Sequence, residues 1–253
     1  MTRRSYADVV AELVRAQKPS AGTPAYSRFV NRKLGRYLAA GAFLAGRTPN
    51  QVSLTSGFCS LAGIVLIATV EPSLPLALGV TALLVLGYAL DSADGQLARL
   101  RGGGSPLGEW LDHMIDCVKI VLLHSAVLVS LYRFDAFGND LVLLVPLAYL
   151  CVSAVMFFGL ILIDQLRRRH GASTVNVRGD SVLKSLLIAP TDYGVLCLVF
   201  LAFGWPEMFT ALYGLLLAAN LLFLLAATAK WYREMAALAP AAKVATASSE
   251  VRG

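Results

Sequence analysis

The segment DSADGQLARLRGGGSPLGEWLDHMID, residues 91–116, joins two long apolar stretches and decides the fold of this chain. It places four acidic residues at the edges of those stretches: Asp91, Asp94, Asp112 and Asp116. Between the two acidic pairs, the glycines and the proline of LRGGGSP, residues 100–106, favour a tight reversal of the chain. We therefore expect two antiparallel helices whose acidic faces meet at one end.

The composition is that of a membrane protein. Of the 253 residues, 57% are hydrophobic and 15% are charged, and the mean hydropathy is +0.66. A helix needs roughly 20 mostly apolar residues to cross a bilayer. Six stretches meet this length: residues 52–70, 74–97, 108–132, 141–163, 182–203 and 207–229. The sequence thus predicts an all-α polytopic membrane protein with six transmembrane helices.

Basic residues alternate between the two sides of these spans. They lie before the first span, between the second and third, between the fourth and fifth, and after the sixth: Arg28, Arg32, Lys33, Arg36, Arg47, Arg99, Arg101, Arg167, Arg168, Arg169, Arg178, Lys184, Lys230 and Arg233. The opposite connections hold a single basic residue, Arg133. Because short loops rich in Lys and Arg stay in the cytoplasm, we expect both termini and the aspartate segment to face the cytoplasm of a bacterial plasma membrane.

The two ends of the chain differ from the membrane domain expected over residues 24–236. Residues 1–23 are polar and weakly patterned, and predict a mobile or loosely helical arm. The following stretch, up to Gly46, predicts an amphipathic helix, with arginines spaced four apart, that lies in the membrane interface; a solvent-exposed helix packed on a neighbour is the alternative. Residues 237–253 are small and polar, and predict a disordered tail.

The spacing of the acids predicts a metal site. Asp91 and Asp94 are three residues apart, and Asp112 and Asp116 are four apart, so that each pair shares a helix face. Four carboxylates that converge near lipid need cations. Oxygen ligands favour Mg²⁺, Mn²⁺ or Ca²⁺ over zinc, and two such ions about 3.5–4 Å apart bind phosphoryl groups. We expect two Mg²⁺ or Mn²⁺ ions, with Arg99 in reach of a substrate phosphate.

The same segment resembles the signature of the CDP-alcohol phosphotransferase family, D-x2-D-G-x2-A-R-x8-G-x3-D-x3-D. Every fixed position matches: Asp91, Asp94, Gly95, Ala98, Arg99, Gly108, Asp112 and Asp116. Six membrane spans and an interfacial N-terminal helix are further points of likeness. The resemblance implies an enzyme of phospholipid or phosphodiester biosynthesis. Such an enzyme uses metal ions to transfer a phospho-alcohol from a CDP-alcohol to a hydroxyl, with release of CMP.

The resemblance also implies roles for single residues and a homodimeric state. Asp91, Asp94 and Asp112 would bind metal, and Asp116 would be both a metal ligand and the catalytic base. The nucleotide and its diphosphate would contact Gly95, Ala98, Arg99 and Gly108. Asn50 in TPNQVS matches a Pro-Asn pair that family members carry near the nucleotide, although a helix N-cap is an equal interpretation of Asn50.

The identity of both substrates stays open at this point. A site at the lipid boundary favours CDP-diacylglycerol as the donor. The segment YSRFVNRKLGR is similar to the helix that precedes the catalytic part in enzymes that use CDP-inositol, a soluble alternative. The basic fourth connection would bind either an acceptor phosphate or anionic lipids, through Arg167, Arg168, Arg169, Arg178 and Lys184. Its flanks, IDQLRRRH and IAPTDYG, depart from the branches that make phosphatidylinositol phosphate or phosphatidylglycerophosphate, so the acceptor is not predicted.

Two other classes of membrane protein deserve comparison. A polyprenyl transferase pairs aspartate-rich helices with Mg²⁺, but would carry two widely separated motifs. A cation transporter would distribute its acids through the membrane midplane, whereas these acids cluster at one face beside a glycine-rich turn. We expect membrane lipids as partners and no nucleic acid.

Overall fold

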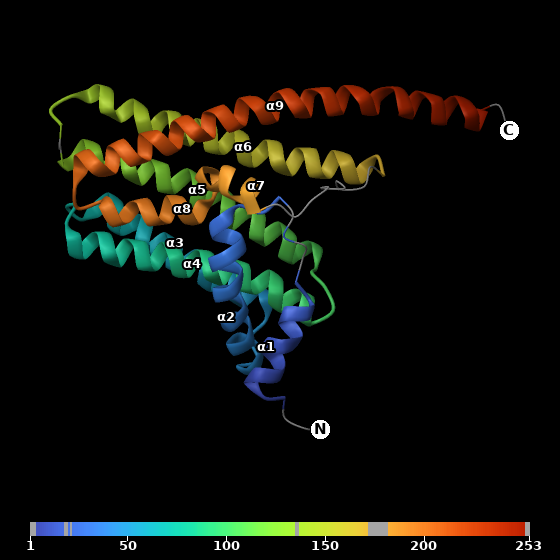
Figure 1. Ribbon diagram of the computed structural model, residues 1–253, viewed down its shortest axis with the longest axis horizontal. Helices are drawn as coiled ribbons and strands as arrows, with labels where there is room; N and C mark the ends of the chain where they lie inside the picture. The colour runs from blue at the N-terminus through green and yellow to red at the C-terminus, as the bar shows by residue number, and fades with distance from the viewer. Residues whose placement is uncertain (1–3, 18–19, 21, 135–136, 172–181, 251–253) are drawn as a thin grey trace.

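In the computed structural model, residues 4–17, 20, 22–134, 137–171 and 182–250 are described, and within these ranges all regular structure is helical (Figure 1). The all-α prediction is therefore confirmed. The elements are α1 (Tyr6–Arg15), η1 (Ser27–Asn31), α2 (Arg32–Leu44), α3 (Pro49–Thr69), α4 (Leu74–Leu100), α5 (Pro106–Phe134), η2 (Asp140–Leu143), α6 (Leu144–Arg169), α7 (Val182–Leu187), η3 (Ala189–Thr191), α8 (Tyr193–Val199), η4 (Phe200–Ala202) and α9 (Pro206–Glu250).

Five helical segments in the described ranges are long and apolar enough to cross a membrane: α3, α4, α5, α6 together with η2, and α9 as far as Ala237. The predicted count of six is not confirmed. The stretch predicted as a continuous fifth span, residues 182–203, is divided into α7, η3, α8 and η4. Pro190 lies in the break, and the side chain of Asp192 caps α8 by accepting a hydrogen bond from the Gly194 amide. A proline interrupts the hydrogen bonds of a helix, and an aspartate at an N-cap favours the start of a new one.

The α4–α5 connection reverses the chain as expected, and α4 and α5 lie antiparallel in Figure 1. Gly102 and Gly103 adopt φ angles of 98° and 133°, which residues with a side chain rarely tolerate. On its other side α4 packs closely on α3, where Ser56 Oγ donates a 2.8 Å hydrogen bond to the Gly87 carbonyl. This turn and this close packing bring the acidic ends of α4 and α5 together.

The N-terminal segment is more ordered than its sequence predicts. Helix α1 begins with a capping box, in which the Ser5 side chain and the Asp8 side chain bond to each other's backbone amides, and it buries Val9 and Leu13. These side chains pack with Ala39, Ala40, Ala93 and Leu97 of α2 and α4. Helix α2 lies within the predicted amphipathic stretch. In Figure 1, α1 and α2 project together from one side of the long-helix bundle.

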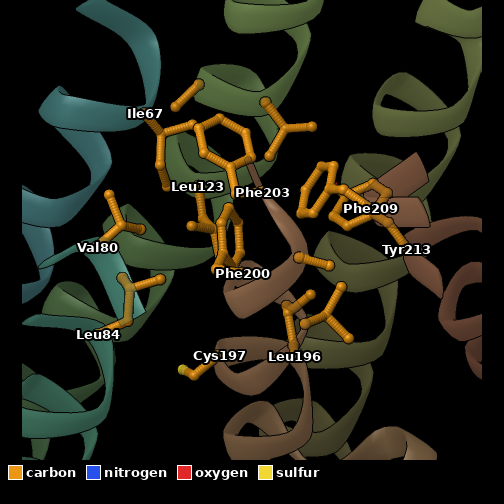
Figure 2. Packing of buried hydrophobic residues seen from close by; sticks show 14 of the residues in the cluster. Ile67, Val80, Leu84, Leu123, Leu196, Cys197, Phe200, Phe203, Phe209 and Tyr213 are labelled. Atoms are coloured by element: carbon orange, nitrogen blue, oxygen red, sulfur yellow. The ribbon is translucent and has the colours of Figure 1, made fainter. Parts of the chain in front are cut away.

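Aromatic side chains fill the bundle beside the divided fifth span. Phe200, Phe203, Phe209 and Tyr213 pack against residues of α3, α4 and α5, including Ile67, Val80, Leu84 and Leu123 (Figure 2). Short helices α8 and η4 are therefore anchored inside the bundle. At the other end of the chain, α9 continues as helix to Glu250, through most of the segment predicted as a disordered tail.

Candidate active site

Three of the four aspartates converge from two helices. Asp91 of α4 and Asp112 and Asp116 of α5 each offer a carboxylate oxygen, and these oxygens lie within 4.8 Å of one another. Asp94 is buried beside them and accepts a hydrogen bond from Ser53 Oγ of α3. The helix faces predicted from the spacing thus meet in one site, and Ser53 is a member that sequence reasoning missed.

A lysine supports this group of carboxylates from within the bundle. Lys119 of α5 is 4% exposed, and its Nζ lies 2.8 Å from Asp91 Oδ1 and 2.7 Å from Asp116 Oδ1. Lys119 therefore bridges the carboxylates of α4 and α5. Sequence reasoning did not single out Lys119, although an ionisable residue one turn deeper in an apolar helix is a functional signal.

The donor set fits hard divalent cations. Among the described residues, this cluster offers carboxylate oxygens and no thiolate or imidazole, which is the chemistry that Mg²⁺ and Mn²⁺ prefer. The four carboxylates also outnumber the three basic side chains beside them, Lys119, Arg32 and Arg99, so their formal charges leave room for cations. The residues present therefore fit the predicted metal.

A large cavity of about 1130 Å³ opens beside these carboxylates, between α3, α4, α5 and α6. Its lining includes all residues predicted to contact nucleotide and diphosphate: Asn50, Gly95, Ala98, Arg99 and Gly108. The lining also includes Phe157, Leu160 and Ile161 of α6. A lining with both polar and apolar side chains suits an amphiphilic ligand. The N-cap interpretation of Asn50 is wrong, because the side chain of Thr48 caps α3.

A second, smaller cavity of about 230 Å³ meets the same carboxylates. Its described lining is polar, charged or glycine: Gln17, Arg32, Asp91, Ser92, Asp94, Gly95, Gln96, Arg99 and Asp112. Asp94, Gly95, Arg99 and Asp112 line both cavities. Gln17 comes from the predicted N-terminal arm and Arg32 from the predicted amphipathic stretch, and neither was predicted as a site residue.

The basic residues predicted to bind an acceptor are not gathered in one place. Arg167 pairs with Glu234 of α9 through two hydrogen bonds of 2.6 and 2.7 Å. Arg168 lines the large cavity and pairs with Asp164 and Glu109. Arg169 and Lys184 are exposed, and Arg178 lies outside the described residues. Of this predicted set, Arg168 alone lines either described cavity.

Comparisons with known proteins identify the family of this chain. Residues 47–231 match the family model described as CDP-alcohol phosphatidyltransferase. The phosphatidylinositol phosphate synthase of Mycobacterium marinum (strain ATCC BAA-535 / M) is 29% identical over 188 residues, which cover 72% of this chain and 73% of that protein.

Two solved structures of Mycobacterium tuberculosis phosphatidylinositol phosphate synthase are also similar. One has CDP-DAG bound; it is 21% identical, with a TM-score of 0.50, and covers 80% of this chain and 94% of that one. The other, a complex with manganese and citrate, is 22% identical with a TM-score of 0.49, over 77% of this chain and 87% of that one. The first likeness shows a shared fold, and the match over residues 47–231 shows that this chain belongs to the CDP-alcohol phosphatidyltransferase family of membrane enzymes, which release CMP.

Proposed function

We propose that this enzyme transfers a phosphatidyl group from CDP-diacylglycerol to a hydroxyl of a small acceptor, with two Mg²⁺ or Mn²⁺ ions held by the four aspartates. The large cavity carries this proposal. Its lining combines the predicted nucleotide residues and three of the four aspartates with the apolar side chains of Phe157, Leu160 and Ile161. A nucleotide-linked lipid can contact both kinds of side chain, whereas a water-soluble CDP-alcohol would leave the apolar ones without a partner.

The names of similar proteins support the choice of donor. The Mycobacterium marinum relative is a phosphatidylinositol phosphate synthase, and one similar structure has CDP-DAG bound. For the orientation, we propose that the site and both termini face the cytoplasm, because the basic connections lie on that side. Homodimerisation stays a prediction from the family resemblance.

The proposed chemistry is one displacement at phosphorus. The carboxylates of Asp91, Asp94, Asp112 and Asp116 would hold the metal ions, and Arg99 would bind a diphosphate oxygen. Bound divalent ions neutralise the diphosphate and stabilise the leaving phosphate. Asp116 accepts the proton of the acceptor hydroxyl. The hydroxyl oxygen forms a bond to the phosphorus that bears diacylglycerol, and the bond from that phosphorus to the CMP oxygen breaks with its electron pair.

CMP release tests the proposal directly. The full chain, purified and placed in lipid nanodiscs with Mn²⁺, is given CDP-diacylglycerol or CDP-inositol with a panel of acceptors: inositol, inositol phosphate, glycerol phosphate and serine. We expect CMP from CDP-diacylglycerol with at least one acceptor. Asp116→Asn should reduce its rate at least about a hundredfold, as expected for loss of a general base.

Asp140→Asn is the matched control, because Asp140 begins η2 in the connection between α5 and α6, at the other end of α5 from the acidic turns. It should leave the rate unchanged. The proposal is refuted if CDP-diacylglycerol yields no CMP with any of the acceptors. Full activity of Asp116→Asn would also refute it. CMP from CDP-inositol alone would replace the donor and keep the chemistry.

A further inference from the structure

We infer that α1 is a positioning element of the active site, and that the carbonyl of its C-cap residue, Ala16, holds Arg99 ready for the diphosphate of the donor. Arg99 Nε donates a 3.3 Å hydrogen bond to this carbonyl. The inference rests on the proposed function for the role of Arg99. It gives a task to a helix that lies before the matched family region, residues 47–231.

Helix α1 has a fixed place on α2 and α4. Its side chains Val9 and Leu13 are fully buried, and they pack in one cluster with Leu97, two residues before Arg99 on α4. Just after α1, Gln17 Nε2 donates a 2.8 Å hydrogen bond to Gln96 Oε1, again on α4. The end of α1 is thus held against the last turns of α4 by apolar contacts and by a hydrogen bond.

The end of a helix is a favourable place for a guanidinium group. Ala16 is the C-cap of α1, and the last carbonyls of a helix lack partners within that helix. They also form the negative end of the helix dipole, which attracts cations. The Ala16 carbonyl therefore gains a donor from Arg99, and the arginine gains an anchor that belongs to the backbone of another element.

The anchor leaves the rest of the guanidinium group for a ligand. Among the described residues, Nη1 and Nη2 of Arg99 form no hydrogen bond with the protein, and a Cβ at Gly95 would lie 3.5 Å from Nη1. Arg99 lines the large cavity together with Asp94 and Asp112. Because the guanidinium group is a rigid plane, fixing Nε limits the directions of the Nη groups, which suit a phosphate.

Anchoring should increase the affinity for the donor. A long side chain that is free before binding loses rotamer entropy when it binds a ligand, whereas a side chain that is already held loses less. Without α1, Arg99 would keep its charge and lose its fixed position. The contribution of α1 should therefore disappear when Arg99 itself is replaced.

A variant that undocks α1 tests the inference. Val9→Asn/Leu13→Asn places two polar side chains in the buried face, where they are unfavourable. Ala7→Asn/Ala11→Asn is the matched control, because both positions are exposed on the same helix. Hydrogen exchange should become faster in α1 of the first variant, with little change in α3, which shows that the bundle still folds.

CMP release with CDP-diacylglycerol as the varied substrate gives the main readout. The undocked variant should lose kcat/KM on the order of tenfold, the usual effect of one hydrogen bond to a charged group. The control variant should stay within about twofold of wild type, because its substitutions do not reach Arg99. In an Arg99→Gln background, undocking should change kcat/KM by less than about twofold, since the two changes remove the same interaction.

Binding of CDP to the Mn²⁺-loaded chain, measured by calorimetry, repeats this double-mutant cycle without turnover. An equal loss from undocking in both backgrounds would show that α1 has only a structural role, and the inference would be wrong. It would also be wrong if undocking changed neither kcat/KM nor the affinity for CDP, and the proposed function would then stand. If CDP-diacylglycerol yields no CMP while undocking weakens CDP binding only when Arg99 is present, the proposed donor fails and the role of α1 remains.

Discussion

Lys119 offsets part of the negative charge of the aspartate site. Burying like charges close together is costly without compensation, and Lys119 gives Asp91 and Asp116 one shared cation at 2.8 and 2.7 Å. In the proposed complex, Lys119 would add its positive charge to that of the metal ions and of Arg99, against the charges of the diphosphate and the four aspartates.

Lys119→Met should destabilise the metal-free protein more than the metal-loaded protein. Removing one partner of a buried ion pair costs on the order of 3 kcal/mol, but bound Mn²⁺ would restore attraction between the carboxylates. Thermal unfolding in EDTA and in Mn²⁺ measures the difference. Lys33→Met should behave as wild type in both buffers, and an equal loss in both would show that Lys119 has only a packing role.

The sequence predicts which residues belong to the site better than it predicts how they pair. The spacing of the four aspartates identified both acidic faces, and Asn50, Gly95, Ala98, Arg99 and Gly108 all line one cavity. The pairing of Lys119 with Asp91 depends on how α4 and α5 are rotated against each other, which no local pattern encodes. Arg167 was predicted as an acceptor ligand because of its positive charge. Its partner Glu234 is far away in the sequence, on α9, so this ion pair could not be predicted.

Among the elements, the contact between α3 and α4 depends on the absence of a side chain at Gly87. A Cβ there would collide with Ser60 Oγ and lie 3.1 Å from the Ser56 carbonyl oxygen, part of the α3 backbone. Gly87→Ala must therefore push the two helices apart. Overpacking costs about 1–3 kcal/mol, so we expect the melting temperature to fall by roughly 3–10 °C.

Gly79→Ala is the matched control on the same helix, since a Cβ at Gly79 meets nothing within 4 Å of it. It should leave the melting temperature unchanged or raise it slightly, because alanine favours helix more than glycine does. Equal behaviour of the two variants would argue against close α3–α4 packing.

Helix α1 should depend on its capping box. Hydrogen bonds from the side chain and backbone of Ser5 lower the pKa of Asp8, so this contribution to stability is present above the ordinary pKa of about 4 and is lost as the pH falls through the lowered value. Ser5→Ala should speed hydrogen exchange in α1 at neutral pH, with little change in α3. Unchanged exchange in α1 would mean that Val9 and Leu13 alone hold the helix.

Hydrophobicity alone did not predict the helices formed by residues 182–203 or the packing of α1. Residues 182–203 are apolar enough to be interpreted as one span, and the signals that divide them, Pro190 and Asp192, are each compatible with a continuous membrane helix. The sequence of α1 contains the signals of its fold, the Ser5–Asp8 capping box and the apolar residues Val9 and Leu13. Their meaning depends on a surface of α2 and α4 that is formed only in the folded protein.

For the whole molecule, the charge distribution predicts a fixed orientation. Glu71→Cys, in the connection between α3 and α4, should react with a membrane-impermeant maleimide from outside intact cells. Gly104→Cys, in the connection between α4 and α5, should react only in inside-out vesicles. The parent protein supplies the background from the four native cysteines, which are free thiols in the structure. The reverse labelling pattern would contradict a cytoplasmic site.

The wall shared by the two cavities has a consequence for the order of events in turnover. Asp94, Gly95, Arg99 and Asp112 border both spaces. If the donor occupies one space and the acceptor the other, both substrates are bound together and the phosphatidyl group passes directly between them. Double-reciprocal plots at several fixed concentrations of the second substrate should then intersect rather than run parallel. Parallel lines would instead indicate a covalent phosphatidyl-enzyme, and would contradict direct transfer between two bound substrates.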